Sequence, residues 1–312
     1  MFENIREVRP VFIVGVGRSG TSLLQSMLDA HPKITFLPET HFYRNYVSAK
    51  KKRATLEQAG VENFVELLEA DQDFKRVNIE PKKLLENYLS AKEEFNLEEV
   101  YRTMLEQYLE NYPETHLVGD KDPRNIDYLE SLYQSFSDAK ILHIVRDPRD
   151  VLSSRMKAAW SKHRPVWQHV LLYETQLKRG RKMGKKLFGA NYLEFRYEDL
   201  ITYPEITLQK IAAHIELEYD ENMLQFSKSA ERLVDKREMS WKKETLGPLL
   251  KTNKDKWKES LKPWQINMAE QVCTTAFKDF DYEYSKAHNQ YGLFAGIKPL
   301  FSNLYQLRLN RE

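Results

Sequence analysis

The first third of the chain begins with short apolar runs and then changes to a helical pattern. PVFIVGV (10–16) is apolar and β-branched, which is typical of a buried parallel strand. Residues 21–31 place four apolar side chains on one face and predict a helix, and ITFLPET (34–40) predicts a second strand. Residues 43–115 are charged, contain a single glycine and are broken at Pro81, so they predict a helical insertion.

Strands and helices alternate after this insertion. HLVGDKDP (116–123) predicts a strand followed by a polar turn. KILHIVRDPRD (140–150) predicts a strand that stops at a charged turn containing proline, and NYLEFRYEDL (191–200) alternates strongly and predicts a further strand. Helices are predicted between and after these strands, at 124–136, 151–160, 204–215 and 262–280.

Alternating strands and helices imply an α/β fold with a mainly parallel central sheet flanked by helices. Ligands of such sheets lie at the carboxyl ends of the strands, which is where the polar turns of this chain fall. No internal repeat or low-complexity linker divides the sequence. We therefore expect one domain over residues 1–312, with the helical insertion at about 43–115 and a C-terminal tail at about 285–312.

Composition excludes several classes of protein. A hydrophobic content of 41% with 17 Tyr and 15 Phe is enough for a sizeable core, and the net charge of +2 gives no reason to expect a nucleic-acid partner. The single cysteine, Cys273, excludes an internal disulfide framework and fits a reducing compartment. No signal-peptide pattern and no apolar run of about 20 residues is present. We expect a cytoplasmic protein without a membrane span.

Two further segments have unusual composition. KRGRKMGKK (178–186) has six basic residues in nine positions, which indicates a solvated helix end or a docking surface for an acidic carrier or anionic acceptor. The tail segment 292–309 is apolar with basic residues between. For this tail we favour packing on the core or on a second subunit over peripheral membrane contact. Packing on a second subunit would make the protein an oligomer.

The stretch FIVGVGRSGTSLL (12–24) nearly completes two phosphate-binding motifs. Gly15, Gly17 and Gly20 form GxGxxG, and Glu39 lies at about the offset of the acidic residue that a dinucleotide fold needs. The helical insertion that follows is unlike such a fold, because further strands should come next. The dinucleotide interpretation is therefore weak.

The second motif is the P-loop of nucleotide-triphosphate enzymes, GxxxxGK[ST]. Thr21 stands where the motif has its lysine, and the nearest cation, Arg18, lies inside the loop. A third interpretation is a loop that holds a smaller phosphorylated group with main-chain N–H donors, hydroxyl groups and one arginine at a helix N-terminus. That interpretation requires no metal.

The segment 12–40 resembles the opening of the sulfotransferases that use 3′-phosphoadenosine 5′-phosphosulfate (PAPS). The similarity continues at DKDP (120–123), at ILHIVRDPRDVLSS (141–154) and at YLEFRYEDLITYPE (192–205), and more weakly at DKWKESL (255–261). Five segments in the family's order are more specific than the loop alone. The chain is similar in these motifs to bacterial and Golgi-type enzymes, including protein-tyrosine and carbohydrate sulfotransferases.

The resemblance implies a P-loop-like fold and transfer of a sulfuryl group from PAPS to an acceptor hydroxyl, with release of adenosine 3′,5′-bisphosphate. It implies no metal ion.

The resemblance also implies which residues bind the nucleotide. Arg146 is expected to bind its 3′-phosphate, and Arg149 is a rival for that role. The residues that the resemblance implies are, for the 5′-phosphosulfate, Gly17, Arg18, Ser19, Gly20, Thr21 and Ser22; for the 3′-phosphate, Arg146 and Ser154; near the adenine, Tyr197; and in a basic C-terminal loop, Lys254 and Lys256.

The resemblance also implies catalytic roles. Glu39 matches a glutamate that acts as general base, and His41 is its rival because cytosolic relatives use histidine. Lys121 matches a lysine that, together with Arg18, stabilises charge developing on the transferring group and the leaving oxygen.

The chain departs from the family at two of these positions. Gly17 precedes the arginine where proline is usual, and His41 stands where protein-tyrosine enzymes have an arginine that holds an acidic peptide. This favours a carbohydrate, lipid or other small-molecule acceptor. The alternatives are a metal-dependent P-loop kinase or NTPase, and a catalytically inactive nucleotide-binding protein that uses its insertion and tail as interaction surfaces.

Overall fold

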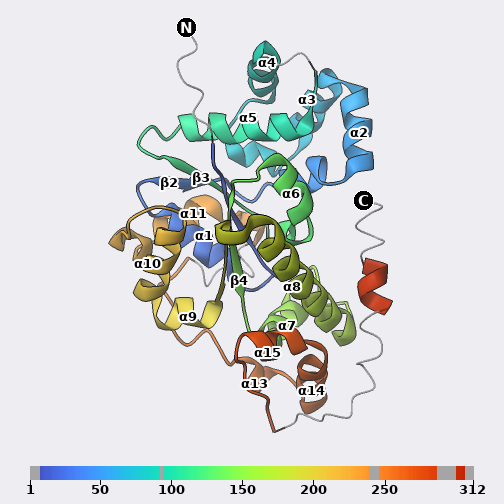
Figure 1. Ribbon diagram of the computed structural model, residues 1–312, viewed down its shortest axis with the longest axis vertical. Helices are drawn as coiled ribbons and strands as arrows, with labels where there is room; N and C mark the ends of the chain where they lie inside the picture. Colours follow the sequence, from blue (N-terminus) through green and yellow to red (C-terminus); the bar gives the residue numbers. More distant parts are fainter. Residues whose placement is uncertain (1–7, 92–93, 239–245, 287–299, 306–312) are drawn as a thin grey trace.

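The computed structural model describes residues 8–91, 94–238, 246–286 and 300–305. Its centre is a five-stranded sheet with the strand order β2-β3-β1-β4-β5, and every neighbouring pair is parallel (Figure 1). The parallel α/β fold expected from the sequence is therefore confirmed. The strands are β1 (Val11–Val14), β2 (Ile34–Phe36), β3 (Leu117–Lys121), β4 (Lys140–Val145) and β5 (Tyr192–Arg196).

The central strands are apolar throughout because helices cover both faces of the sheet. In β1, Phe12 and Val14 belong to one hydrophobic core, whereas Val11 and Ile13 belong to the core on the opposite face. All four side chains are fully buried. A strand buried on both faces loses the polar alternation of a half-exposed strand, which explains the run of apolar residues.

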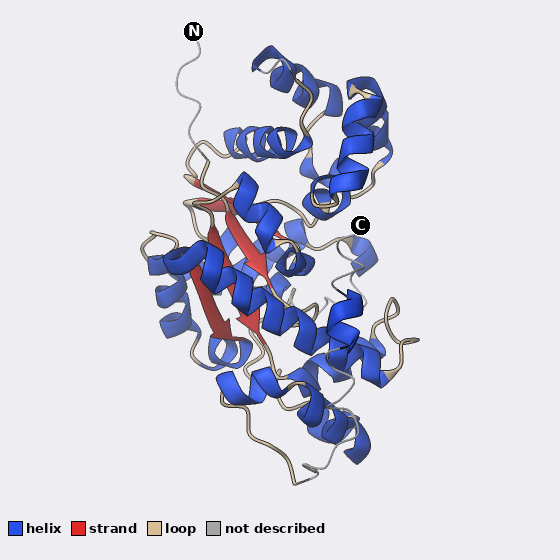
Figure 2. Cartoon of the chain, turned by 45° about the vertical axis from the view of Figure 1, so that its right-hand side comes forward, coloured by secondary structure: helices blue, strands red, loops and turns tan. Residues whose placement is uncertain are grey.

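The helices form layers on either side of the strands, as Figure 2 shows. One face carries α1, α9, α10 and α11, and the other carries α5, α6 and α8, with a third core beneath α7, α8, α14 and α15. The bounds of these helices outside the insertion, with the short α13, are α1 Thr21–Asp29, α6 Leu129–Ser135, α7 Pro148–Lys157, α8 Val166–Phe188, α9 Tyr197–Thr202, α10 Pro204–His214, α11 Ser227–Leu233, α13 Trp257–Ser260, α14 Pro263–Val272 and α15 Thr274–Asp279.

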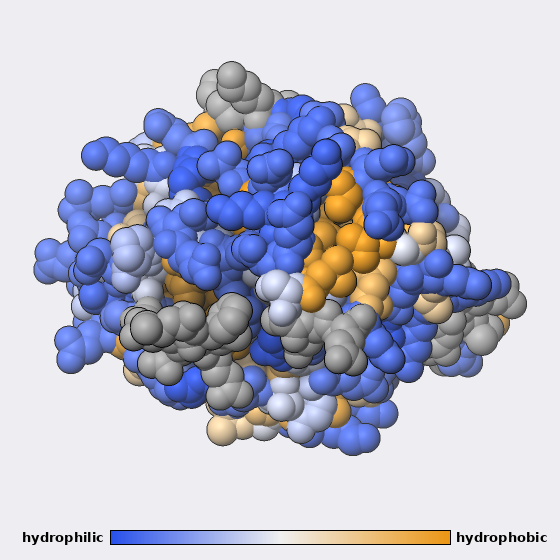
Figure 3. Space-filling model, turned by 90° about the horizontal axis from the view of Figure 1, so that it is seen from above, coloured by the Kyte–Doolittle hydropathy of each residue, from blue (hydrophilic) through white to orange (hydrophobic). Residues whose placement is uncertain are grey.

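The segment predicted as a helical insertion is helical, which confirms that prediction. Its aromatic side chains pack on one another: the rings of Tyr43 and Tyr101 lie 5.2 Å apart, and Tyr101 also stacks on Phe42, which immediately precedes the insertion. The face of the molecule seen from above in Figure 3 is mostly hydrophilic, with apolar side chains showing between the charged ones. The elements are η1 (Tyr43–Val47), α2 (Lys50–Ala59), α3 (Val61–Ala70), η2 (Phe74–Val77), α4 (Pro81–Ala91) and α5 (Leu97–Glu110).

Two predicted elements have different bounds in the structure. The strand predicted over 191–200 ends at Arg196, because Glu198 and Asp199 lie in the first turn of α9, where acidic side chains favour the helix N-terminus. The helix predicted over 262–280 is divided at Cys273 into α14 and α15. The basic run at 178–186 forms the end of α8, as predicted.

Most of the predicted tail, residues 287–299 and 306–312, lies outside the described residues. The helical residues 300–305 pack on the chain itself: the Tyr305 hydroxyl donates a hydrogen bond to Asp127 Oδ2 at 2.8 Å, and Phe301 packs against the third core. Among the described residues, no helix has the length and apolar character that crossing a membrane requires.

Candidate active site

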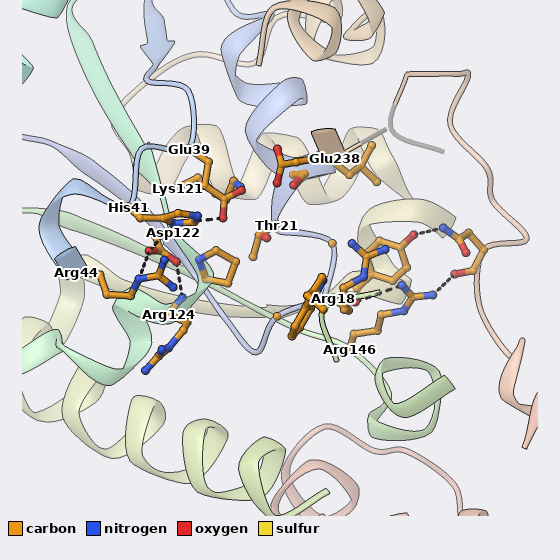
Figure 4. A pocket seen from close by; sticks show the side chains of 18 of the residues that line it. Arg18, Thr21, Glu39, His41, Arg44, Lys121, Asp122, Arg124, Arg146 and Glu238 are labelled. Carbon is orange, nitrogen blue, oxygen red and sulfur yellow. Dashed lines mark hydrogen bonds and ion pairs between the residues drawn. The ribbon is translucent and has the colours of Figure 1, made fainter. Parts of the chain in front are cut away.

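A cavity of about 440 Å³ opens at the carboxyl edge of the sheet. Every strand contributes to it, because the turns that leave parallel strands meet at one edge. β1 leads into the glycine-rich loop, β2 into the segment of Glu39, and β3 ends at Lys121; β4 and β5 are followed directly by Arg146 and Tyr197. Glu39 and Lys121 lie at one end of the cavity and Arg18 and Arg146 at the other, with Thr21 between them (Figure 4).

The loop between β1 and α1 has the features of an anion-binding site. Gly20 is the N-cap of α1 and gives no side-chain cap, so the first N–H groups of the helix are left for a ligand. The hydroxyl of Ser19 is buried and has no hydrogen-bond partner among the described residues. Thr21 and Ser22 line the cavity beside it. A buried hydroxyl without a partner is costly, and a bound anion would supply one.

The backbone and surroundings of Gly20 leave no room for a larger residue. Its φ is +95°, and a Cβ there would lie 2.3 Å from the Tyr197 ring. Gly20→Ala should lower the free energy of unfolding by about 2–5 kcal/mol through backbone strain and overpacking. Gly17→Ala is the matched control, because a Cβ at Gly17 meets nothing within 4 Å. Urea denaturation of both variants checks this, and equal stabilities would contradict it.

The predicted nucleotide residues Arg18, Arg146, Ser154 and Tyr197 lie together. Arg146 packs over the Tyr197 ring at 4.3 Å and donates to the carbonyl oxygen of Asn253 at 2.9 Å. Arg18 Nε donates to Ser154 Oγ at 3.0 Å. Arg146 Nε is buried and makes no hydrogen bond with the described residues. The aromatic ring holds the guanidinium in place and leaves a donor for a ligand.

Arg149, the rival of Arg146, has a different position. Its guanidinium pairs with Asp147 and with Glu270, at 2.7 Å each, and packs 3.9 Å over Trp257. It is buried and does not line the cavity. Its partners account for its charge, whereas Arg146 lines the cavity.

The predicted lysines of the C-terminal loop do not line the cavity. Lys254 Nζ donates to Thr202 Oγ1 at 3.0 Å, and Lys256 is the exposed N-cap of α13. From the same loop, Leu250 and Asn253 do line it. Asn253 also donates to the Tyr197 hydroxyl at 2.9 Å, which joins this loop to the strand edge.

The opposite end of the cavity holds a cluster of charged groups. Lys121 and Glu39 form a buried ion pair, and only 1% of Lys121 is exposed. His41 Nδ1 lies 2.9 Å from Asp122 Oδ2 and 3.8 Å from Glu39 Oε1. Arg44 Nε lies 3.6 Å from the same Asp122 oxygen. A carboxylate and an ammonium group thus face the cavity side by side.

The helical insertion supports this cluster from behind. The hydroxyl of Tyr101, on α5, donates to Asp120 Oδ2 at 2.7 Å, and Asp120 immediately precedes Lys121 on β3. Burial raises the pKa of Asp120 to about 6, although the hydrogen bond from Tyr101 and the charge of Lys121 act in the opposite direction. The insertion therefore positions the end of β3.

The pKa of His41 is raised above its usual value. Burial acts to lower it, but the charge and hydrogen bond of Asp122, with the charge of Glu39, outweigh burial. A histidine with a raised pKa keeps its proton over a wider pH range and cannot accept another while it is protonated, which favours Glu39 over His41 for proton abstraction.

A raised pKa makes the stabilisation by His41 depend on pH. Protonated His41 stabilises the fold fully below the ordinary histidine pKa of about 6.5, and this contribution is lost as pH rises through the higher folded pKa. The difference in unfolding free energy between wild type and His41→Gln should therefore be larger at pH 5.5 than at pH 9. Urea denaturation at both pH values measures it, and a difference that grows with pH would contradict the assignment.

Glu39, His41 and Asp122 also place potential metal ligands within 4.8 Å of one another. Lys121 pairs with Glu39, and Arg44 lies beside Asp122. Two resident cations oppose the binding of a third, so the electrostatics of the cluster favour an internal ion-pair network over a metal centre.

Sequence reasoning missed several residues that line the cavity. Asp122 lies within the DKDP motif and Arg124 directly follows it, so both could have been found there. Arg44 comes from the insertion, Trp160 lies just after α7, and the other two come from late segments without a motif. The missed residues are Arg44, Asp122, Arg124, Trp160, Glu238 and Asn253.

A family model described as the sulfotransferase family matches residues 10–221. A protein-tyrosine sulfotransferase of Drosophila melanogaster is 25% identical over 236 residues, which cover 70% of this chain and 40% of that protein. The chain spans 27–51% of the length of three curated relatives that it matches.

Two solved structures share the fold. The sulfotransferase domain of the Synechococcus PCC 7002 olefin synthase aligns with a TM-score of 0.61 and 22% identity, over 89% of this chain and 96% of that domain. The sulfotransferase domain from the curacin biosynthetic pathway aligns with a TM-score of 0.64 and 18% identity, over 90% and 100%. The expected P-loop-like fold is thereby confirmed. With more than half of its 312 residues matched by the family model, the chain belongs to the sulfotransferase family.

Proposed function

We propose that this chain transfers the sulfuryl group of PAPS to an acceptor hydroxyl and releases adenosine 3′,5′-bisphosphate. The observation that carries the proposal is the division of the cavity. The glycine-rich loop before α1 lies in the middle, a carboxylate–lysine pair at one end and a stacked arginine at the other (Figure 4).

The residues present fit the nucleotide. The loop from Gly17 to Ser22, with the N-terminus of α1, would hold the 5′-phosphosulfate, and the Ser19 hydroxyl and loop N–H groups would donate to it. Arg146 and Ser154 would hold the 3′-phosphate. Arg18, which is hydrogen-bonded to Ser154, would lie between the 5′-phosphosulfate and the 3′-phosphate. A nucleotide with phosphates at both the 5′ and 3′ positions would use both sets of donors.

The chemistry of the transfer assigns a role to each charged group. The hydroxyl oxygen forms a bond to sulfur while the bond between sulfur and the phosphate oxygen breaks, and the electrons of that bond remain on the departing phosphate. Glu39 accepts the hydroxyl proton, which keeps positive charge from building up on the attacking oxygen. Lys121 and Arg18 stabilise the negative charge that moves to the leaving oxygen. The step needs no metal ion.

The acceptor is proposed to be a carbohydrate, lipid or other small-molecule hydroxyl. His41 supports this choice. It occupies the position at which protein-tyrosine enzymes have a peptide-binding arginine, and its side chain is hydrogen-bonded to Asp122. The Drosophila melanogaster relative is named a protein-tyrosine sulfotransferase, so acceptor screens should also include a tyrosine peptide.

Incubation with ³⁵S-labelled PAPS tests the proposed activity. The purified chain is given a panel of phenols, sugars, hydroxylated lipids and tyrosine peptides, with EDTA present. We expect labelled product and an equal amount of adenosine 3′,5′-bisphosphate with at least one small molecule. Labelling of the tyrosine peptides alone would overturn the proposed acceptor class. Hydrolysis of ATP to ADP, or phosphoryl transfer from ATP, in a parallel assay with magnesium and without EDTA would point to the kinase alternative.

A further inference from the structure

A second cavity of about 640 Å³ adjoins the first. The two share four lining residues, Gly17, Arg44, Arg124 and Trp160. Arg44 and Arg124 belong to the end of the first cavity that holds Glu39 and Lys121, and the Arg124 side chain extends away from that pair (Figure 4). The second cavity thus continues from the acid–base end of the site. We call it the arginine chamber, after the four arginines that line it: Arg44, Arg124, Arg155 and Arg164.

Arg155 is the central observation. Only 3% of it is exposed, yet among the described residues no carboxylate pairs with it or contributes to its pKa. Its Nε donates to His169 Nδ1 at 3.2 Å, and its guanidinium lies 5.5 Å from the Trp160 ring. Burial and the charge of Arg155 lower the pKa of His169 to about 4, so this partner is neutral at pH 7. A buried cation without an anion is costly, and an anionic ligand in the chamber would offset that cost.

The other arginines of the chamber carry more positive charge than their partners cancel. Arg124 Nε lies 3.5 Å from Asp127 Oδ2, but that oxygen also accepts hydrogen bonds from Gln176 and Tyr305. Arg164 is exposed at the rim. Its charge and that of Arg124 contribute to lowering the pKa of Arg155 to about 10, after burial as the main cause. No acidic side chain is among the described residues that line the chamber.

The remaining walls are apolar. Trp160 is 47% exposed at the boundary between the two cavities, and Leu304 is 57% exposed near the opening. Leu172 and Phe301 complete this side. Guanidinium groups beside such a surface suit a ligand with an anionic group on an apolar body.

We propose that the arginine chamber binds an oxyanion carried by the acceptor, whose hydroxyl then lies between Glu39 and Lys121. The acceptor is accordingly a hydroxyl compound with an apolar segment that ends in a phosphate or carboxylate. This inference rests on the proposed function, because it takes the acid–base end of the first cavity as the place of transfer. It assigns Arg155 and Arg164 as acceptor-binding residues, separate from the arginines of the nucleotide end.

Calorimetric titration with phenyl phosphate tests the chamber while saturating adenosine 3′,5′-bisphosphate blocks the nucleotide end. We expect phenyl phosphate to bind at least about tenfold more tightly than benzyl alcohol, as one charge-assisted hydrogen bond allows. Arg164→Gln, at the exposed rim, should weaken phenyl phosphate severalfold, and Arg155→Gln should weaken it by about tenfold or more. Arg9→Gln removes an exposed arginine that lies outside both cavities and should change nothing.

Each contrary result has a distinct meaning. Arg164→Gln leaves the buried network intact. If both this variant and Arg155→Gln bind phenyl phosphate as tightly as wild type does, the proposal that the chamber binds an oxyanion is overturned. Inorganic phosphate bound as tightly as phenyl phosphate would overturn the acceptor assignment, since the chamber would then hold a free anion. Failure of adenosine 3′,5′-bisphosphate itself to bind would instead overturn the proposed function. A titration without the bisphosphate would still measure the affinity of the chamber for phenyl phosphate.

Discussion

Replacing Glu39 with glutamine is expected to lower the rate of sulfuryl transfer by about 10²- to 10⁴-fold, the range that general bases contribute. The carboxylate faces the cavity beside Lys121, and glutamine keeps its size and an oxygen for the lysine while it removes the proton acceptor. Affinity for adenosine 3′,5′-bisphosphate should stay nearly unchanged, because the nucleotide donors lie at the other end of the cavity (Figure 4). The rate is measured with ³⁵S-labelled PAPS and the best acceptor of the panel.

The control for this variant is His41→Gln. His41 lies 3.8 Å from Glu39 and already hydrogen-bonds Asp122, so its loss should reduce the rate much less. A large loss in His41→Gln with a nearly active Glu39→Gln would reverse the assignment of the base. An unchanged rate in both variants would show that neither group accepts the proton.

The second large effect is expected for Arg146→Ala, which should weaken binding of adenosine 3′,5′-bisphosphate by about 100-fold. The guanidinium is held over Tyr197 with a buried Nε that has no partner among the described residues, so a 3′-phosphate would gain charge-assisted hydrogen bonds there. AMP lacks the 3′-phosphate, and its affinity should change little. Calorimetric titration with the two nucleotides gives the ratio directly.

Lys256→Ala is the companion variant, because Lys256 is exposed on the neighbouring loop and does not line the cavity. It should leave both affinities close to those of wild type. Equal losses of bisphosphate and AMP affinity in Arg146→Ala would indicate a general disturbance of the loop and would remove the 3′-phosphate role from this residue.

The sequence alone predicted the parallel sheet and the edge at which the site lies. β1 and β4 are apolar because helices bury both of their faces, and the polar residues follow directly where these strands end. Glu39 and Lys121 were named from a motif, and the structure brings them into one ion pair. This part was predictable because each signal is contained in a short segment.

Other features depend on contacts between segments far apart in the chain. Arg146 and Arg149 lie in one motif, and contacts with distant residues, such as those of Glu270 and Trp257 with Arg149, tell them apart. The strand β5 ends before Tyr197 because the next residues form a helix that the alternating pattern concealed.

The arginine chamber was hidden for the same reason. Arg155 follows Ser154 on α7, whereas Arg44 comes from the insertion and Phe301 from the tail. No local pattern indicates that these residues share a cavity, because each belongs to a different part of the chain.

The loop and Arg146 are proposed to select a nucleotide with a 3′-phosphate. Calorimetric titration of the purified chain with adenosine 3′,5′-bisphosphate, beside ADP with and without magnesium, tests it most directly. We expect tighter binding of the bisphosphate than of ADP, with no dependence on magnesium. Tighter binding of magnesium-ADP would exclude this selectivity and identify the site as that of a kinase or NTPase.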